Sequence, residues 1–160
     1  PVGIIPDENC RHVTVGDTPC DFVLLDQYGE PWQLYAQRGK VIVVDISTVW
    51  CYPCQMAGYS AQPIQDSYND VVFVTVLVDG RVSGIEPTSE EVSEWSIDHG
   101  NTTSPVLQGS KEKMLDIYGI TGYSISGYPS YFYIDQNMVI YSAHTGFNEQ
   151  YVKQIIEEKI

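Results

Sequence analysis

Two uninterrupted runs of hydrophobic residues predict neighbouring strands at the centre of a sheet. Residues 41–46 read VIVVDI and residues 71–78 read VVFVTVLV, with Asp45 as the charged residue in the first run. Runs without polar alternation are typical of parallel strands buried on both faces, and such strands usually lead into helices that cover the sheet. The hydrophobic pattern therefore predicts an α/β fold.

Two segments show the spacing of amphipathic helices. In residues 52–68 the larger apolar side chains recur every three or four positions, and this stripe is expected to face the sheet: Tyr52, Met56, Tyr59, Pro63, Ile64 and Tyr68. In residues 148–160 the same spacing predicts burial of Tyr151, Val152, Ile155, Ile156 and Ile160.

Capping and turn signals place the shorter elements. Thr88 and Glu91 form a capping box for a helix that ends at His99 and Gly100, and another helix is expected over about residues 110–118. Short strands are expected in two hairpins and one isolated segment, at residues 22–25 and 32–35, 131–135 and 138–143, and 105–107.

The amino-acid composition argues against several classes of function. The chain has 160 residues, of which 21 are acidic and 8 basic, giving a formal net charge of −13. This charge argues against binding to nucleic acids or anionic membranes, because both require positive patches. No stretch approaches the ~18 consecutive apolar residues of a membrane span. The sequence begins at Pro1 without Met, which is compatible with removal of a leader or an anchor.

Cys51 and Cys54 form a C-x-x-C motif between the first hydrophobic run and the helix that follows it. The free N–H groups and positive dipole at the start of a helix favour an anion, here a thiolate. The same spacing serves zinc sites, but a structural zinc needs four ligands, usually in two close pairs. Cys10 and Cys20 are not a second pair of this spacing, so we expect a redox dithiol and no metal ion.

The segment V-D-I-S-T-V-W-C-Y-P-C resembles the active-site segment of the thioredoxin superfamily. The resemblance includes Trp50 before the first cysteine, Pro53 before the second, and Asp45 six residues ahead of Cys51. It implies that Asp45 is buried behind the cysteines and helps to move the proton of the Cys54 thiol. An aspartate in an apolar run is costly to bury without a function, which favours the same role.

Other segments resemble the TlpA-like and peroxiredoxin-like (redoxin) branch of this superfamily. GDTPCDF, then LDQYGE, then RGKVIVVD follow the order in which that branch places a hairpin before the core. The resemblance implies a thioredoxin fold, with a central mixed β-sheet flanked by helices and an N-terminal β-hairpin extension. We expect one domain over residues 1–160, made of an arm (1–18), the hairpin extension (19–39) and the core (40–160) with an inserted helix near 88–98.

Tyr128 and Pro129 resemble the cis-proline site that thioredoxin-fold proteins place beside the dithiol. Proline is tolerated at the first position of a strand, and an aromatic residue before it raises the chance of a cis bond. The backbone of Tyr128 is expected to pair with a substrate chain as an added strand. The expected substrate-binding residues are Trp50, Tyr52, Pro53, Tyr128 and Pro129.

The resemblance implies an enzyme that exchanges disulfides with protein substrates and needs no cofactor. Cys51 attacks a substrate disulfide as a thiolate, and Cys54 resolves the mixed disulfide. Proline before Cys54 favours reduction, so a redox partner must recycle the pair. The expected partners are therefore protein thiols and disulfides and this unidentified recycling partner.

Two alternatives use the same cysteines differently. Peroxiredoxins carry P-x-x-x-[ST]-x-x-C at this junction; Thr48 fits that pattern, but Val44 stands at the proline position. A Cu(I) carrier of the Sco type would add a distant histidine, His99 or His144, to the two thiolates. That family separates its cysteines by three residues rather than two, so both alternatives rank below disulfide exchange.

Cys10 and Cys20 favour an oxidising compartment. A structural disulfide between them would close a short loop and contribute roughly 2–3 kcal/mol of stability. Two free thiols or a second redox pair are the alternatives. We therefore expect an extracytoplasmic protein, periplasmic or secreted, after removal of any leader or anchor.

Overall fold

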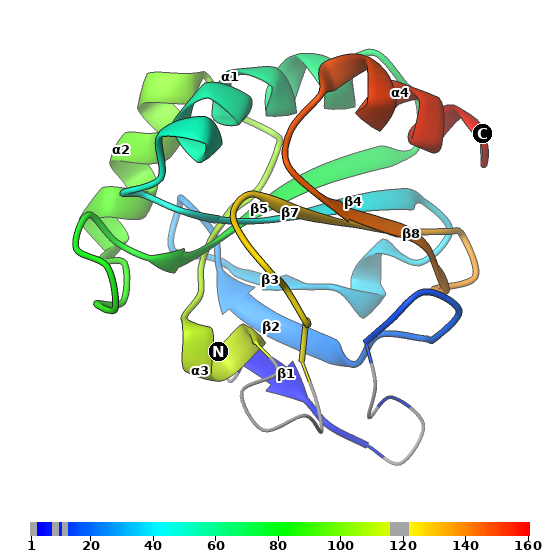
Figure 1. The fold of residues 1–160 in the computed structure, drawn as a ribbon, viewed down its shortest axis with the longest axis horizontal. Coiled ribbons are helices and arrows are strands. Elements are labelled where there is room, and N and C mark those ends of the chain that lie inside the picture. Colours follow the sequence, from blue (N-terminus) through cyan, green and yellow to red (C-terminus); the bar gives the residue numbers. More distant parts are fainter. Residues whose placement is uncertain (1–2, 8–9, 11–12, 116–121) are drawn as a thin grey trace.

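The computed structural model describes residues 3–7, 10, 13–115 and 122–160, which form an α/β fold around a mixed eight-stranded sheet (Figure 1). The strands lie in the order β1-β2-β6-β5-β4-β7-β8, and β3 pairs with β2 beside this path. Their bounds are Gly3–Ile5 (β1), Asp21–Leu25 (β2), Pro31–Gln33 (β3), Val41–Thr48 (β4), Val71–Asp79 (β5), Val106–Gln108 (β6), Ser130–Ile134 (β7) and Ile140–Thr145 (β8).

The helices cover both sides of this sheet. Figure 1 shows α1, α2 and α4 on one side of the central strands and α3 beside β1 on the other. Their bounds are Tyr52–Asp66 (α1), Ser89–His99 (α2), Lys111–Met114 (α3) and Glu149–Glu157 (α4), with a short 3-10 helix at Tyr35–Gln37.

The two hydrophobic runs form the centre of the sheet, which confirms the first prediction from the sequence. Every residue of β4 and β5 is buried, and the two strands pair in parallel. β7 pairs with β4 in the antiparallel direction, so the sheet is mixed. Side chains alternate across a strand. Val41 and Val43 of β4 pack with residues of α1 and α4, whereas Ile42 and Val44 join the core on the opposite face.

The predicted buried stripe of α1 is correct for Ile64, which is buried, and for Tyr68, which packs against the core just beyond the helix end, but is wrong for its other four members. Tyr52, Met56 and Tyr59 are more than half exposed, and Pro63 is exposed as well. The buried residues of the helix are mainly small: Cys54, Ala57, Gly58, Ala61, Gln62 and Ile64. Small side chains let the helix backbone lie close to the sheet, whose own valines and aromatic rings fill the interface. The large side chains of α1 are therefore left at the surface.

The last helix is shorter than predicted. α4 begins after Asn148, whose side chain accepts a hydrogen bond from the Tyr151 backbone N–H at 3.0 Å. Val152, Ile155 and Ile156 are buried as expected. Ile160 is exposed because it lies beyond the helix end. Tyr151 is also exposed, with its ring resting against His144 rather than in the core.

Local signals place α2 correctly. The Thr88 Oγ1 accepts from the Glu91 N–H at 3.1 Å and the Glu91 carboxylate accepts from the Thr88 N–H at 2.9 Å. Gly100 ends the helix at φ 72°, a left-handed conformation that glycine adopts at little cost.

The structure differs from the sequence analysis at the end of α3 and in the N-terminal arm. α3 ends at Met114 because Leu115 is extended, and the rest of the helix predicted to residue 118 lies outside the described residues. The N-terminal arm contains β1, a strand that the sequence analysis did not place, and β1 pairs antiparallel with β2.

Candidate active site

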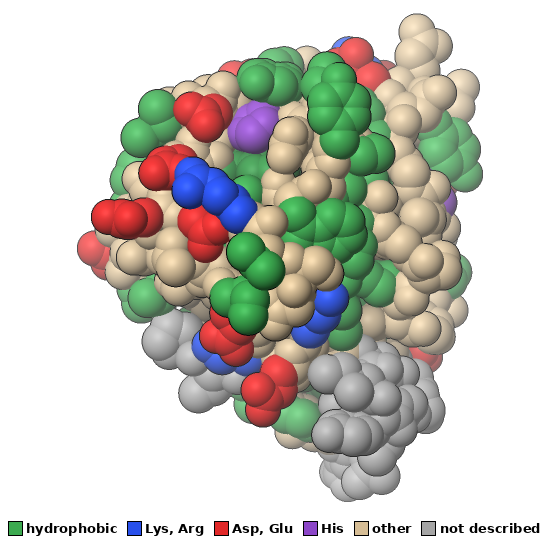
Figure 2. Space-filling view, turned by 60° about the vertical axis from the view of Figure 1, so that its left-hand side comes forward, with side chains coloured by type: hydrophobic (Ala, Val, Ile, Leu, Met, Phe, Trp, Pro, Cys, Tyr) green, Lys and Arg blue, Asp and Glu red, His purple; other side chains and the backbone are tan. Residues whose placement is uncertain are grey.

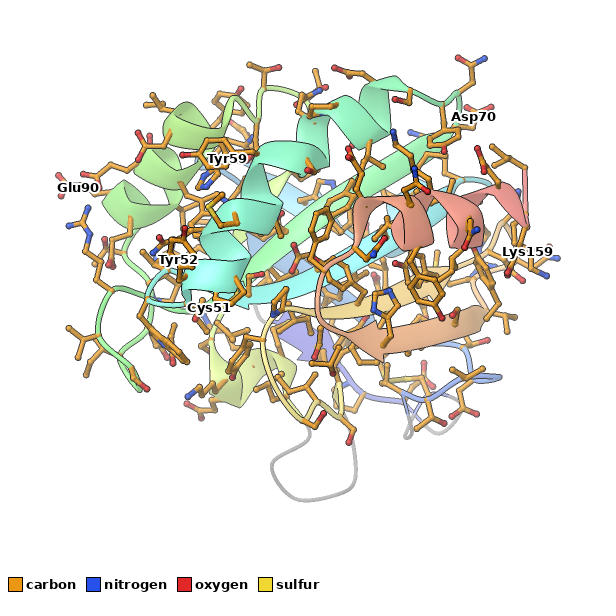
Figure 3. The ribbon with its side chains drawn as sticks, turned by 45° about the horizontal axis from the view of Figure 1, so that its top comes forward. Cys51, Tyr52, Tyr59, Asp70, Glu90 and Lys159 are labelled. Carbon is orange, nitrogen blue, oxygen red and sulfur yellow. A yellow bond between two sulfur atoms is a disulfide. The ribbon has the colours of Figure 1, made fainter. Side chains whose placement is uncertain are left out.

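Cys51 and Cys54 lie at the start of α1, where the chain leaves β4. Cys51 is the N-cap of the helix, and its Sγ accepts a hydrogen bond from the Cys54 N–H at 3.3 Å. The two sulfurs form a disulfide, with the Cα atoms 5.2 Å apart. Cys51 is 5 % exposed and Cys54 is fully buried, so an attacking group reaches Cys51 first. Figure 3 shows Cys51 at this end of α1.

The local sequence explains this placement. Pro53 lies in the first turn of α1, where a residue without an N–H costs no helical hydrogen bond. The Cys54 N–H of that turn points at the Cys51 sulfur, and the positive end of the helix dipole stabilises a thiolate there after reduction. The junction therefore favours Cys51 as the nucleophile.

Tyr128 and Pro129 lie directly beside the dithiol. The Tyr128 carbonyl oxygen is 3.7 Å from the Cys51 Sγ, and the Tyr128–Pro129 peptide bond is cis. Pro129 precedes β7, the strand that pairs with β4. The chain 77 residues after Cys51 thus presents its backbone at the Cys51 sulfur.

Asp45 is buried on the side of β4 that α1 covers. Its side chain is shielded from solvent, and the Ser47 Oγ donates a hydrogen bond to its Oδ1 at 2.5 Å. Burial raises the pKa of Asp45 to about 7, although the Ser47 and Tyr131 hydroxyls oppose this rise. A carboxyl group with such a pKa can take up and release a proton near neutral pH.

Asp79 is a site residue that the sequence analysis missed. It accepts hydrogen bonds through Oδ2 from the Trp50 Nε1 at 2.9 Å and the Gly84 N–H at 3.1 Å, and Lys111 forms an ion pair with the same oxygen at 3.0 Å. Burial raises the pKa of Asp79, but these partners more than offset it, so the pKa lies below its usual range. The available signal was a carboxylate directly after the hydrophobic run of residues 71–78, similar to the placement of Asp45 within the run of residues 41–46.

An aromatic surface surrounds Cys51. Tyr52 is 69 % exposed and Trp50 is 41 % exposed, and the Trp50 ring meets the Tyr128 ring edge-on with centroids 5.8 Å apart. Val82 and Ile85 of the loop after β5 are exposed as well. Figure 2 shows hydrophobic side chains gathered in the middle of the face it presents, with acidic side chains to one side.

The histidines considered as copper ligands have other partners. The His99 ring nitrogens lie 2.7 Å from the Trp95 carbonyl oxygen and 2.8 Å from the Gln55 carbonyl oxygen. The His144 Nε2 is 2.8 Å from the Tyr133 hydroxyl. Within residues 3–7, 10, 13–115 and 122–160, no three His, Cys, Asp or Glu side chains form a group that could hold a metal ion.

The second cysteine pair is bonded in the structure. Cys10 and Cys20 form a disulfide, and their Cα atoms are 4.9 Å apart, within the usual range for disulfides. Both cysteines are buried. The bond joins the N-terminal arm to the start of β2.

Comparison with known proteins identifies the family. Residues 15–143 match the AhpC/TSA family, a span that includes both active-site cysteines, Asp45 and Pro129. The chain belongs to this family.

Relatives of this AhpC/TSA chain match it over most of its length. It is 25 % identical to the thioredoxin-like protein YneN of Bacillus subtilis, over 91 % of this chain and 78 % of that one. It is 26 % identical to the thiol-disulfide oxidoreductase ResA of Geobacillus thermodenitrificans, with the same two shares covered. The exposed lipoprotein thioredoxin Etrx1 of Streptococcus pneumoniae superposes with a TM-score of 0.71, at 24 % identity, over 87 % of this chain and 99 % of that one.

These comparisons agree with the geometry of the site. The fold is the thioredoxin fold, and the protein is a thiol-disulfide oxidoreductase. Among the helices in the described part of the chain, none has the length and hydrophobicity needed to cross a membrane.

Proposed function

We propose that the reduced Cys51–Cys54 pair reduces disulfides of protein substrates. The observation that carries this proposal is the position of Cys51, the more accessible sulfur, at the start of α1 and beside the Tyr128 carbonyl. A helix start lowers the pKa of a thiol placed on it, so a fraction of Cys51 is thiolate at neutral pH.

The proposed reaction moves two electrons from the protein to the substrate. The Cys51 thiolate attacks one sulfur of the substrate disulfide, forming a mixed disulfide and releasing the other substrate sulfur as a thiolate. The Cys54 thiolate then attacks the Cys51 sulfur. This second step forms the Cys51–Cys54 disulfide seen in the structure and releases the first substrate sulfur.

Asp45 serves as the base for the second step. Cys54 is fully buried, so its thiol needs an internal proton acceptor before it can attack. Asp45 lies on the face of β4 that is covered by α1, the helix carrying Cys54, and its pKa of about 7 suits proton uptake at neutral pH. The proton moves from the Cys54 sulfur to the Asp45 carboxylate.

The substrate docks as an extended chain across the cysteine pair. The backbone of Tyr128, which has its carbonyl 3.7 Å from the Cys51 sulfur, pairs with the substrate backbone. The exposed rings of Trp50 and Tyr52 contact its side chains. Pro53 and Pro129 hold the two sides of this surface in place.

The direction and location of the reaction belong to the same proposal. Reduction consumes the dithiol, so a redox partner must return two electrons to Cys51 and Cys54. An extracytoplasmic location, periplasmic or secreted, is supported by the Cys10–Cys20 bond, since such bonds persist in oxidising compartments. It is also supported by the similarity to a lipoprotein described as exposed.

Insulin turnover by the dithiothreitol-reduced protein tests the proposal. Cys51→Ser is expected to abolish turnover, and Cys54→Ser to stop after one attack and accumulate a mixed disulfide at Cys51, detected by peptide mass mapping. The double variant Cys10→Ser/Cys20→Ser is the matched control, which retains turnover. Unchanged turnover in Cys51→Ser would refute the mechanism.

A further inference from the structure

Three hydroxyl groups lie around the buried Asp45 carboxyl, and in the described part of the chain only the Ser47 hydroxyl forms a hydrogen bond of normal geometry with it. The Ser47 hydroxyl donates to Asp45. The hydroxyls of Thr75 and Tyr131 are fully buried, and no atom in the part of the chain that the structure describes forms a hydrogen bond with either. Buried polar groups are nearly always satisfied, so two unpaired hydroxyls near one carboxyl require an explanation.

The register of the sheet places both hydroxyls next to Asp45. Asp45 of β4 is opposite Thr75 of β5 on one side and opposite Tyr131 of β7 on the other. Residues paired in this way project from the same face of a sheet, with their Cβ atoms about 5 Å apart. Val41, Val43, Phe73 and Tyr133 mark this face as the one covered by α1 and α4. Thr75 and Tyr131 therefore flank the carboxyl within the same closed layer.

Both hydroxyls are suited to act as donors to a carboxylate. Burial, and next the Asp45 charge, raise the pKa of Tyr131, so its hydroxyl keeps its proton. Threonine does not ionise. A hydrogen bond to a charged carboxylate is about twice as strong as one to a neutral group, so these donors favour the ionised form of Asp45.

We propose that Thr75 and Tyr131 are positioning residues that hold the Asp45 carboxylate ready to accept the Cys54 proton. This inference rests on the proposed function. In the reduced protein both hydroxyls donate to the carboxylate. When the proton passes from the Cys54 sulfur to Asp45, the carboxyl becomes neutral and the two hydrogen bonds weaken.

Among the described residues, few other titratable groups lie on the elements packed against the Asp45 face of the sheet. β7 contributes Tyr131 and, one pair further along, Tyr133, and α1, which covers this face, carries Cys54 in its first turn. The His144 ring of β8 lies against the Tyr131 ring, with centroids 5.1 Å apart. The His144 Nε2 is 2.8 Å from the Tyr133 hydroxyl. A shift in the titration of Asp45 on removing one hydroxyl can therefore be assigned to that hydroxyl.

Carbon-13 NMR titration of the Asp45 carboxyl in the reduced protein tests the proposal without requiring turnover. Tyr131→Phe and Thr75→Val each remove one donor, and each is expected to raise the titration midpoint by about one pH unit, the effect of losing one charge-assisted hydrogen bond. Thr75→Ser keeps a hydroxyl and is expected to restore the midpoint. Tyr133→Phe is the matched control, because it removes a buried hydroxyl from the same strand face whose partner is His144.

The pH profile of mixed-disulfide resolution provides the second readout. Its rising limb is expected to move by the same amount in Tyr131→Phe and Thr75→Val, and to be absent in Asp45→Asn with or without Tyr131→Phe. Midpoints unchanged in both donor variants, or shifted equally by Tyr133→Phe, would overturn the inference. Loss of the proposed function would appear differently, as unchanged insulin turnover in Cys51→Ser, whatever the titrations show.

Discussion

At the scale of single residues, the raised pKa of Asp45 suits its proposed role as a base but lowers the stability of the folded protein near neutral pH. The carboxyl is buried among valines and tyrosines, so its ionised form is poorly solvated and its pKa rises to about 7. In the unfolded chain the same group ionises near pH 4. Between these two values the folded protein holds a proton that the unfolded chain has lost. Stability therefore falls as pH rises through this window and levels off above about pH 7.

Asp45→Asn is expected to remove this loss of stability. An asparagine resembles the protonated carboxyl and does not titrate. The free energy of unfolding of the variant therefore increases relative to that of the parent as pH rises. The gain between pH 5 and pH 8 is expected to be about 3 kcal/mol, from two units of pH at 1.36 kcal/mol each. Urea unfolding of both oxidised proteins at the two pH values measures it. A difference that is the same at pH 5 and pH 8 would show that Asp45 does not titrate in this window.

At the scale of elements, the contact between α1 and α2 depends on Gly58. A Cβ at this position would lie 2.7 Å from the His99 Cδ2 and 2.9 Å from its Nε2. The ring cannot move away easily, because both its nitrogens contact carbonyl oxygens and it lies between the rings of Tyr59 and Trp95. Glycine in the middle of a helix is thus required by the histidine of the next helix.

Gly58→Ala is expected to destabilise the protein by about 1–3 kcal/mol, the usual cost of overpacking. In a His99→Ala background the same change is expected to stabilise by up to about 1 kcal/mol, because alanine favours helix over glycine. Chemical unfolding of the four proteins of this cycle measures both effects. Equal effects of Gly58→Ala in the two backgrounds would mean that His99 does not set the requirement.

The same two helices show which elements can be predicted from the sequence. The bounds of α2 follow from Thr88, Glu91 and Gly100, whose signals are local and need no knowledge of neighbours. The buried face of α1 could not be predicted from its large residues. Ala57 and Ala61 are buried because α1 lies close to the sheet, and Gly58 is needed because His99 of α2 lies close to it. Both requirements come from tertiary contacts.

The candidate site was predictable to a similar degree. The positions of Cys51, Cys54 and Asp45 follow from one continuous segment, so the strand-to-helix pattern is enough to place them together. Asp79 and Lys111 are brought to Trp50 only by the pairing of β4 with β5 and the position of α3, which no local pattern records. The dependence on long-range pairing therefore explains why Asp79 and Lys111 could not be predicted from the sequence.

At the scale of the whole molecule, the N-terminal arm is tied to the sheet twice. β1 pairs with β2, and the Cys10–Cys20 bond joins residues ten positions apart. The bond restricts the unfolded chain, so Cys10→Ser/Cys20→Ser is expected to lose about 2–3 kcal/mol of stability, measured by guanidinium unfolding. Because this pair has a structural role in the account, the variant is expected to keep its insulin turnover. A loss of turnover as large as that of Cys51→Ser would mean a second redox pair.

The molecule as a whole is proposed to be a reductase, and the reduction potential of the Cys51–Cys54 couple tests this claim most directly. Equilibration in glutathione and dithiothreitol buffers, with each cysteine pair assigned by peptide mass mapping, gives the potential of each pair separately. For a reductase, the Cys51–Cys54 couple is expected to have a value near or below about −250 mV, in the range of disulfide reductases. A value of about −150 mV or higher would identify a disulfide donor instead and contradict the proposed direction.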